Sequence, residues 1–152
     1  MTSFIAVLLT LLAATPHITM ATSASVAPGA TVRPGATVKL FVDVIPDRKI
    51  RVYAPGAKDY LPVVLVLSTP PSGVRAGKLN YPPSQDWYFE PLNEHVPVYQ
   101  APFRLTQDIV VGTAVKPGQT LTVSGVLKYQ ACDDTICYNP VTAPVSWTIS
   151  VK

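Results

Sequence analysis

The sequence predicts an all-β protein folded as a sandwich of two sheets. The chain has 152 residues, of which 48% are hydrophobic and only 14% are charged, as expected for one globular domain. Its 16 prolines and 8 glycines are spread along the whole chain, which favours short segments separated by turns over long helices. No segment keeps a helical period of hydrophobic residues over three turns.

Short runs rich in β-branched residues recur along the chain, and turn-forming residues separate them. They are Val38–Ile45, Lys49–Ala54, Pro62–Ser68, Phe103–Val111, Thr120–Ala131 and Val145–Val151. A proline-glycine turn at Lys116–Gln119 precedes the fifth of these runs. Six or seven short strands with turns about every 8–12 residues describe a β-sandwich, most simply an immunoglobulin-like one.

Residues 79–100 do not fit this pattern, because four prolines and five aromatic residues occur there without the alternation of a strand. Ordering an irregular stretch of this length costs conformational entropy, so such a stretch in a compact domain usually has a task. It is either a surface connection whose aromatic side chains pack on the sandwich edge, or a lid or contact surface.

The N-terminal 24 residues contain no Lys, Arg, Asp or Glu. Their apolar stretch, Phe4–Ala14, is too short for a bilayer-spanning helix, which needs about 20 residues. It suits the core of a secretory signal, and Thr22-Ser23-Ala24 offers small residues for cleavage. We therefore predict a signal peptide over 1–24 and an exported domain over 25–152, with an N-terminal membrane tether as the alternative.

Both cysteines of the chain, Cys132 and Cys137, flank a short turn that contains two aspartates. In the chain-entropy model, a disulfide closing a six-residue loop stabilises a fold by about 2 kcal/mol, against about 4 kcal/mol for a loop of 60 residues. A bond between two positions that a hairpin already brings together therefore adds little stability. The spacing leaves two interpretations open, a small structural loop and a redox-active pair.

The alternation along Thr120–Ala131 places Cys132 on the polar face of its strand, where a partner could reach it. A bulge at Gly125 would reverse that assignment. Asp133 and Asp134 lie beside Cys132 in the sequence, and their negative charge disfavours its thiolate. Such a pair is a weak nucleophile by itself, so we expect it to exchange disulfides only inside a specific complex.

Several other kinds of site lack the residues they need. A structural zinc site takes four Cys or His ligands, and the predicted mature chain offers two cysteines and His95, so we expect no metal. There is no C-x-x-C motif of a thioredoxin and no C-x-x-C-H of a c-type haem protein. The net charge of +3 comes from scattered basic residues, and so we expect no nucleic-acid partner.

The stretch YQACDDTICYNP, residues 129–140, resembles the signature of the periplasmic N-terminal domain of the DsbD thiol:disulfide interchange proteins. That signature is Y-Q-x-C, a short acidic turn, then C and a proline. IRVYAP at 50–55 and the stretch before the last strands resemble the family more weakly, and the likeness covers about residues 36–150. Four residues separate the cysteines here, where the best-known members have five, and the sequence contains no membrane or thioredoxin-like domain.

The resemblance implies an immunoglobulin-like fold with a redox-active disulfide and no other cofactor. Cys132 and Cys137 match the redox pair, and Cys137 matches the cysteine that forms the mixed disulfide. An aromatic side chain is expected to shield the pair until a partner docks. The candidates for it are Phe89 first, then Trp87 and Tyr88. The other residues expected to line the site are Tyr53, Tyr129, Gln130, Asp133, Asp134 and Tyr138.

Domains of this family take electrons from a membrane-embedded reductase through a thioredoxin-like domain. They pass them to periplasmic thioredoxin-fold proteins, including those of cytochrome c biogenesis. We therefore expect a periplasmic thiol-disulfide oxidoreductase that relays electrons between thioredoxin-fold proteins, with a membrane thiol reductase supplied by another protein. The alternative is a non-catalytic, exported immunoglobulin-like binding or assembly module whose disulfide is structural.

Overall fold

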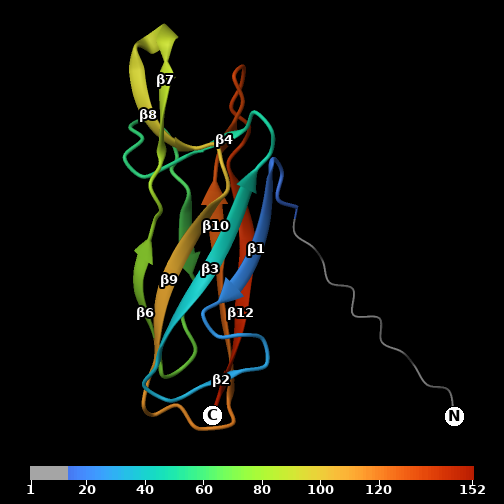
Figure 1. The fold of residues 1–152 in the computed structure, drawn as a ribbon, viewed down its shortest axis with the longest axis vertical. Helices are drawn as coiled ribbons and strands as arrows, with labels where there is room; N and C mark the ends of the chain where they lie inside the picture. Colours follow the sequence, from blue (N-terminus) through green and yellow to red (C-terminus); the bar gives the residue numbers. More distant parts are fainter. Residues whose placement is uncertain (1–13) are drawn as a thin grey trace, which may run out of the picture.

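The computed structural model describes residues 14–152, which form three four-stranded sheets (Figure 1). The first sheet has the order β1 (Ile18–Ala24), β3 (Thr37–Pro46), β9 (Phe103–Val111), β6 (Val74–Asn80). The second has the order β2 (Thr31–Val32), β12 (Val141–Val151), β10 (Thr120–Tyr129), β5 (Val64–Leu67). The third has the order β11 (Ala131–Cys132), β4 (Arg51–Tyr53), β8 (Glu94–Tyr99), β7 (Gln85–Phe89). One turn of 3-10 helix, η1 (Glu90–Leu92), connects β7 to β8.

The main core lies between the first two sheets. Strands β3, β9, β10 and β12 bury nearly every second residue, since successive side chains of a strand point to opposite faces. Leu40, Leu105, Val123 and Trp147 are examples from the four strands. The predicted all-β, immunoglobulin-like sandwich is confirmed.

Gly125 does not host a bulge. Strand β10 pairs without interruption with β12, from Thr120 opposite Ser150 to Tyr129 opposite Val141. A Cβ atom at Gly125 would lie 2.5 Å from the carbonyl oxygen of Val66, so glycine is required where the β5 backbone approaches. The assignment of buried and outward faces along β10 therefore holds as predicted.

The strongest strand predictions agree with the structure to within a few residues. The segment Phe103–Val111 is the whole of β9, and Val38–Ile45 lies within β3. Strand β12 begins four residues before the predicted start at Val145 and includes Pro144. Proline is tolerated there because β12 has a second neighbouring strand only at Ser150 and Val151, which leaves an edge free.

The expectation that residues 79–100 are irregular was wrong. They contain the end of β6 and the whole β7–β8 hairpin, in which Gln85–Phe89 pairs with Glu94–Val98. Aromatic side chains on both faces of β7 and Pro97 within β8 hide the alternation in the sequence. Strands β1, β2 and β6 were also not among the predicted strands.

The start of the described chain belongs to the sandwich. Strand β1 pairs along its whole length with β3, and Ile18 is buried. Most of the predicted signal peptide, residues 1–13, lies outside the described residues. Cleavage after Ala24 would remove β1 from the sheet, so the boundary at residue 24 stays a prediction. Within residues 14–152, no helix has the length and apolar character needed to cross a bilayer.

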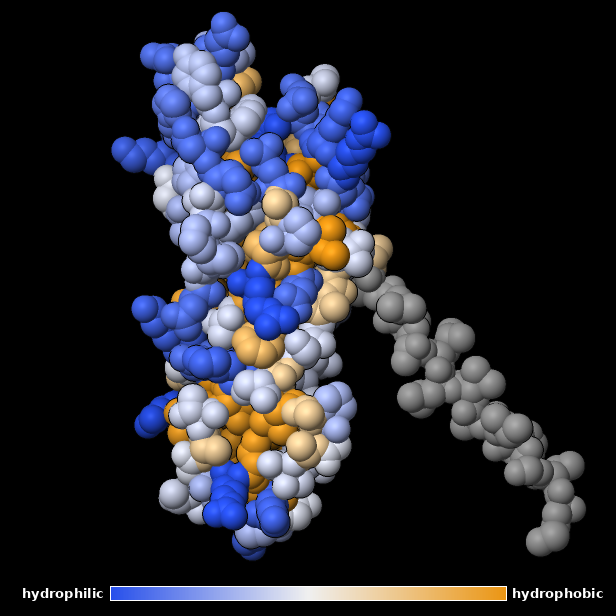
Figure 2. Space-filling view, in the orientation of Figure 1, coloured by the Kyte–Doolittle hydropathy of each residue, from blue (hydrophilic) through white to orange (hydrophobic). Residues whose placement is uncertain are grey.

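The third sheet lies at one end of the sandwich, and the C-terminus lies at the other (Figure 1). Strand β11 follows β10 after one residue, so the second sheet leads directly into the third. The β7–β8 hairpin and the hairpin after β11 both extend from this end. Its surface in this view is mainly hydrophilic (Figure 2).

Candidate redox site at the Cys132–Cys137 hairpin

Cys132 and Cys137 form a disulfide across a tight hairpin. The main-chain N–H of Asp133 donates to the carbonyl of Ile136, and the N–H of Tyr138 donates to the carbonyl of Ala131. The disulfide therefore lies between two rungs of backbone hydrogen bonding. Opening the bond would leave the hairpin's own hydrogen bonds available to hold its shape.

The two sulfur-bearing residues differ sharply in exposure. Cys132 is only 1% exposed, whereas Cys137 is exposed at the surface. The expectation that a partner could reach Cys132 was wrong, because side chains of β4 and β8 bury it in a small apolar cluster on one face of the third sheet. Cys137 is therefore the residue of the pair that a partner meets at the surface.

Cys132 belongs to a small apolar cluster that is separate from the main core. Its buried members are Tyr53, Ala57, Val96, Val98 and Cys132, and the partly buried Tyr60 and Trp87 pack against them. The Tyr53 hydroxyl lies 3.6 Å from Sγ of Cys137, and its ring stacks on Tyr60 at 4.3 Å between centroids. Burial raises the pKa of Tyr53, so its hydroxyl stays neutral beside the disulfide.

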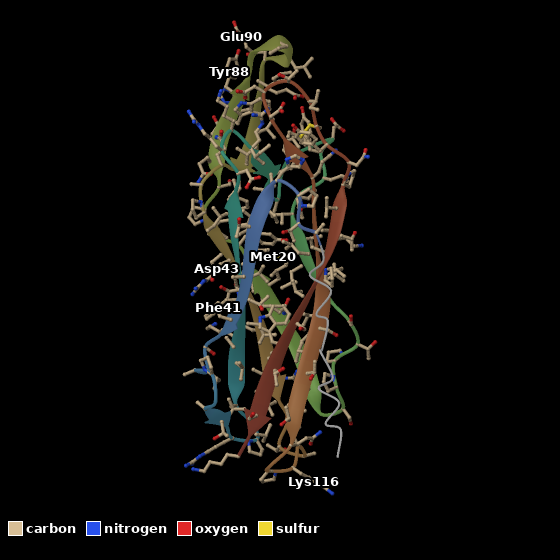
Figure 3. All side chains as sticks on the ribbon, turned by 90° about the vertical axis from the view of Figure 1, so that its right-hand side faces the viewer. Met20, Phe41, Asp43, Tyr88, Glu90 and Lys116 are labelled. Atoms are coloured by element: carbon tan, nitrogen blue, oxygen red, sulfur yellow. A yellow bond between two sulfur atoms is a disulfide. The ribbon has the colours of Figure 1, made fainter. Side chains whose placement is uncertain are left out.

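The three aromatic residues of β7 occupy different surroundings. Trp87 packs on the Cys132 cluster, and Phe89 stacks on Trp87 with 5.1 Å between the ring centroids. Tyr88 points to the other face of the strand, where its exposed hydroxyl donates to Oδ1 of Asn93. Figure 3 shows Tyr88 and Glu90 at the tip of this hairpin, at the same end of the molecule as the disulfide. Trp87 is therefore the β7 aromatic that contacts the cluster directly.

Arg51 is a component of the site that the sequence analysis did not identify. Its side chain is only 5% exposed, and its Cζ atom lies 3.5 Å from the centroid of the Trp87 ring. Nη1 donates to Oδ1 of Asp134, and Nη2 donates to the carbonyl of Asp133. Arg51 also lies directly opposite Cys132 in the β4–β11 pairing. Its position two residues before Tyr53, on the same face of a strand, is the signal that could have revealed it.

The two aspartates of the turn are both engaged. The Asp133 carboxylate accepts hydrogen bonds from the main-chain N–H groups of Thr135 and Ile136 and from the Tyr138 hydroxyl. These donors lower the pKa of Asp133, the Ile136 N–H contributing most. Asp134 is largely exposed and pairs with Arg51 at 3.0 Å. The negative charge beside Cys132 is thus accompanied by a buried positive charge.

The remaining predicted residues divide between the site and the core. Tyr138 stacks on His17 at 3.9 Å between centroids, and Gln130 donates to the Tyr138 carbonyl, so both support the hairpin from the side of the N-terminal segment. Tyr129 lies in the main core instead, where its hydroxyl donates to the Pro16 carbonyl. Burial raises the pKa of Tyr129 to about 12.

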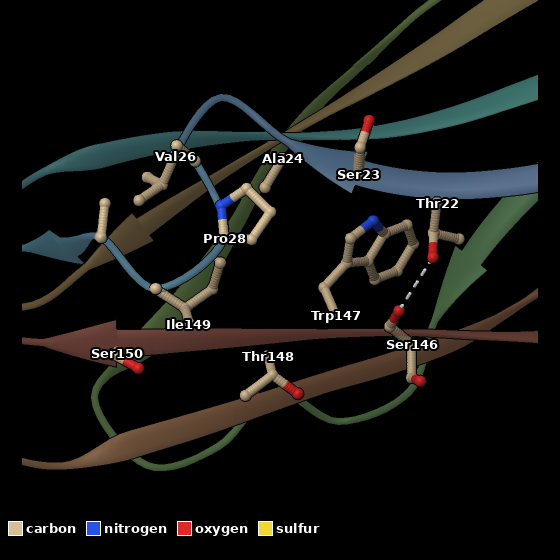
Figure 4. A pocket seen from close by; sticks show the side chains of 13 residues that line it. Thr22, Ser23, Ala24, Val26, Pro28, Ser146, Trp147, Thr148, Ile149 and Ser150 are labelled. Carbon is tan, nitrogen blue, oxygen red and sulfur yellow. Dashed lines mark hydrogen bonds between the residues drawn. The ribbon is translucent and has the colours of Figure 1, made fainter.

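One cavity lies away from this site. Its volume is about 420 Å³, and Figure 4 shows its lining between β1 and β12, around Trp147. There the Thr22 hydroxyl donates to the Ser146 carbonyl. The cavity contains none of the predicted site residues. Among residues 14–152 no three His, Cys, Asp or Glu side chains gather as metal ligands do.

Comparisons with known proteins point to one family. Residues 29–147, which include both cysteines, match the family model "Thiol:disulfide interchange protein DsbD, N-terminal". No curated protein matches the chain.

Several solved structures are similar to the chain, among them two bacterial N-terminal domains. The N-terminal domain of Neisseria meningitidis DsbD in its reduced form is 17% identical, with a TM-score of 0.42 and 80% of each chain covered. The N-terminal periplasmic domain of ScsB from Proteus mirabilis is 11% identical, with a TM-score of 0.56. This second match covers 90% of the present chain and 47% of the ScsB chain, so the chain spans about half of that structure. At this identity the likeness to ScsB shows the shared fold.

Proposed function

The chain belongs to the family of DsbD N-terminal domains, and from that premise we propose that it relays electrons by thiol-disulfide exchange through Cys132 and Cys137. The observation that carries the proposal is the pairing of one exposed cysteine residue with one buried cysteine residue in a hairpin that backbone hydrogen bonds close independently. That arrangement presents a single point of attack.

The exchange proceeds in two balanced steps. A thiolate of a reduced partner attacks Sγ of Cys137, the Cys132–Cys137 bond breaks, and Cys132 leaves with the electron pair and takes up a proton. The partner's second thiol then attacks its own sulfur in the mixed disulfide and releases Cys137 as a thiol. The domain is now a dithiol and the partner a disulfide. The reverse sequence passes the two electrons to an oxidised partner.

The aromatic side chains of β7 limit which thiols take part. Trp87 packs on the cluster that contains Cys132, and Phe89 stacks on Trp87. These two rings are the proposed shield of the pair, with Trp87 in contact with the cluster and Phe89 stacked on Trp87. A docking partner displaces them and so lets its sulfur reach the disulfide. Tyr88, on the outward face, is available to contact the partner.

The partners are thioredoxin-fold proteins of the periplasm, with a membrane thiol reductase as the source of electrons. Export to that compartment uses an N-terminal signal. The predicted boundary at residue 24 would remove β1 from the sheet, so we propose instead a cleavage before Ile18, which keeps β1 paired with β3. The mass of the exported protein tests this point. A mature N-terminus at residue 25 would contradict it.

A trapping experiment tests the relay. The Cys132→Ser variant leaves the exposed Cys137 free, and we expect it to hold a thioredoxin-fold protein from a periplasmic extract as a mixed disulfide that reductant releases. The matched control is Cys137→Ser, in which the remaining Cys132 is buried and should trap far less. If neither variant traps a protein, or both trap equally, the proposal fails. The chain would then be better described as a binding or assembly module with a structural disulfide.

A further inference from the structure

Arg51 is an unusual residue to find buried, and its side chain is incompletely paired. Arginine is almost never buried without partners that compensate for its lost hydration. Its two terminal nitrogens have acceptors in Asp134 and in the Asp133 carbonyl, but Nε has no hydrogen-bond partner within the described residues. One charged N–H group is therefore buried without an acceptor, which destabilises the oxidised form.

The position of Arg51 relates this unpaired donor to the disulfide. Arg51 and Cys132 are directly opposed on neighbouring antiparallel strands, and side chains opposed in this way lie on the same face of the sheet, with Cβ atoms about 5 Å apart. Tyr53, two residues further along β4, reaches Sγ of Cys137 from that same face. The positive charge of Arg51 also acts on the Tyr53 hydroxyl, where it opposes the larger effect of burial on the pKa. Arg51 thus lies on the same face of the third sheet as the disulfide.

The chemistry of exchange creates the acceptor that this donor lacks. When a partner attacks Cys137, negative charge develops on the sulfur of Cys132, which is 1% exposed in an apolar cluster. A thiolate in such surroundings is strongly disfavoured unless a positive charge or a hydrogen-bond donor lies next to it. A disulfide sulfur carries no such charge, so the interaction strengthens only as the bond breaks.

We propose that Arg51 is a positioning residue of the exchange reaction, holding a buried positive charge and a free N–H group against the Cys132 sulfur as it leaves. This inference rests on the proposed function. Trp87 holds the guanidinium plane from one side, and the turn residues Asp133 and Asp134 hold its terminal nitrogens. The acidic turn therefore orients the cation at the leaving group, in addition to adding negative charge near it.

Every Arg51 variant keeps the other titratable groups that lie near the site. From the turn they are Asp133, Asp134 and Tyr138, and His17 stacks on the last of these. From the other elements they are Tyr53 on β4, Tyr60 on the following loop, and Glu94 on β8, which accepts from the Tyr60 hydroxyl. The charge of Arg51 acts to lower the pKa of Tyr53 and of Asp133, so its replacement changes these two groups as well as the environment of Cys132.

The test measures how fast dithiothreitol reduces the disulfide across a range of pH, since a leaving thiol of lower pKa leaves faster. We expect Arg51→Met to slow reduction by about threefold or more, which corresponds to a leaving-group pKa higher by about one unit. Arg51→Lys keeps the charge but loses the planar set of guanidinium donors, so its reduction rate should lie between those of Arg51→Met and the wild type. In a Cys137→Ser background, the pKa of the Cys132 thiol should be higher with Met than with Arg at position 51.

The matched control is Arg104→Met. Arg104 also packs on an aromatic ring, that of Phe41, and pairs with the Asp43 carboxylate, but it lies on the first sheet and is exposed. We expect its replacement to leave both the reduction rate and the Cys132 pKa unchanged. Equal rates in wild type, Arg51→Met and Arg104→Met would overturn the inference. The trapping result on Cys132→Ser would be unaffected, so the two proposals fail separately.

A measurement on the wild-type protein covers the case in which Arg51→Met does not fold. The N–H resonance of Arg51 Nε should move on reduction of the disulfide and should titrate together with the Cys132 thiol. A resonance that is identical in the oxidised and reduced proteins over the whole pH range would contradict the proposed contact.

Discussion

The sandwich body and the third sheet bury their side chains in different ways. In the body, long strands alternate between buried aliphatic and outward polar residues, and both sheets contribute to one core. In the third sheet, short strands bury a disulfide sulfur, two stacked tyrosines and an arginine next to a half-buried tryptophan. The core of the body requires only that apolar residues recur with the period of a strand. In the third sheet, each buried polar group requires a particular partner.

This difference suggests that the sandwich body provides the stability of the fold and that the third sheet carries the reactive bond. The main core does include Val52, Tyr99 and Ala131 of the third sheet, but neither Cys132 nor Arg51 belongs to it. We therefore expect the body to hold its shape without the small cluster. The third sheet can then carry an exchangeable bond and an incompletely paired cation at limited cost to the fold. Substitutions in the two regions should therefore have different consequences.

The largest expected effect is in the body. Leu105→Ala removes a fully buried side chain and should lower the free energy of unfolding by about 2–5 kcal/mol. Trp87→Ala, at the edge of the third sheet, should lower it by no more than about 2 kcal/mol, the scale of a cation–π contact, while increasing the rate at which small thiols reduce the disulfide. Urea unfolding and reduction kinetics measure the two quantities. Equal destabilisation by both substitutions would show that the two regions form one cooperative core.

The disulfide itself should have an intermediate effect on stability. A chain with both Cys132→Ala and Cys137→Ala should be less stable than the oxidised protein by about 2 kcal/mol, the loop-entropy value for a six-residue ring. It should stay folded, because the backbone hydrogen bonds of the hairpin and the β11–β4 pairing remain. Thermal unfolding and the dispersion of amide NMR signals check this. Collapse of the signal dispersion would mean that the bond is needed for the fold.

The smallest effect is the acid sensitivity of the turn. Hydrogen bonds to the Asp133 carboxylate lower its pKa in the folded state, so its stabilising contribution is present above the ordinary value of 3.8 and is lost as the pH falls through the folded pKa. Below pH 3.8, the free energy of unfolding of Asp133→Asn should therefore fall less steeply with decreasing pH than that of the wild type. Asp43→Asn, in the body, serves as the matched control. Identical acid unfolding profiles for the wild type and Asp133→Asn would show that Asp133 does not contribute to the pH dependence of stability.

The sequence predicted the strands of the sandwich body better than those of the third sheet. β9 and β10 were found from runs of β-branched residues bounded by turns, and the cysteine pair was found from its motif. The β7–β8 hairpin was missed because its aromatic residues lie on both faces. The burial of Cys132 and the role proposed for Arg51 depend on the pairing of β11 with β4 in the third sheet, a tertiary contact that no local sequence pattern records.

The reduction potential of the Cys132–Cys137 pair, measured in glutathione or dithiothreitol buffers, tests the central claim most directly. A bond that partners open and close should have a potential in the range of exchange proteins, about −120 to −270 mV, with the sandwich fully folded in both states. A potential below about −300 mV would contradict a relay, because thioredoxin-fold partners could not then reduce the pair to a useful extent.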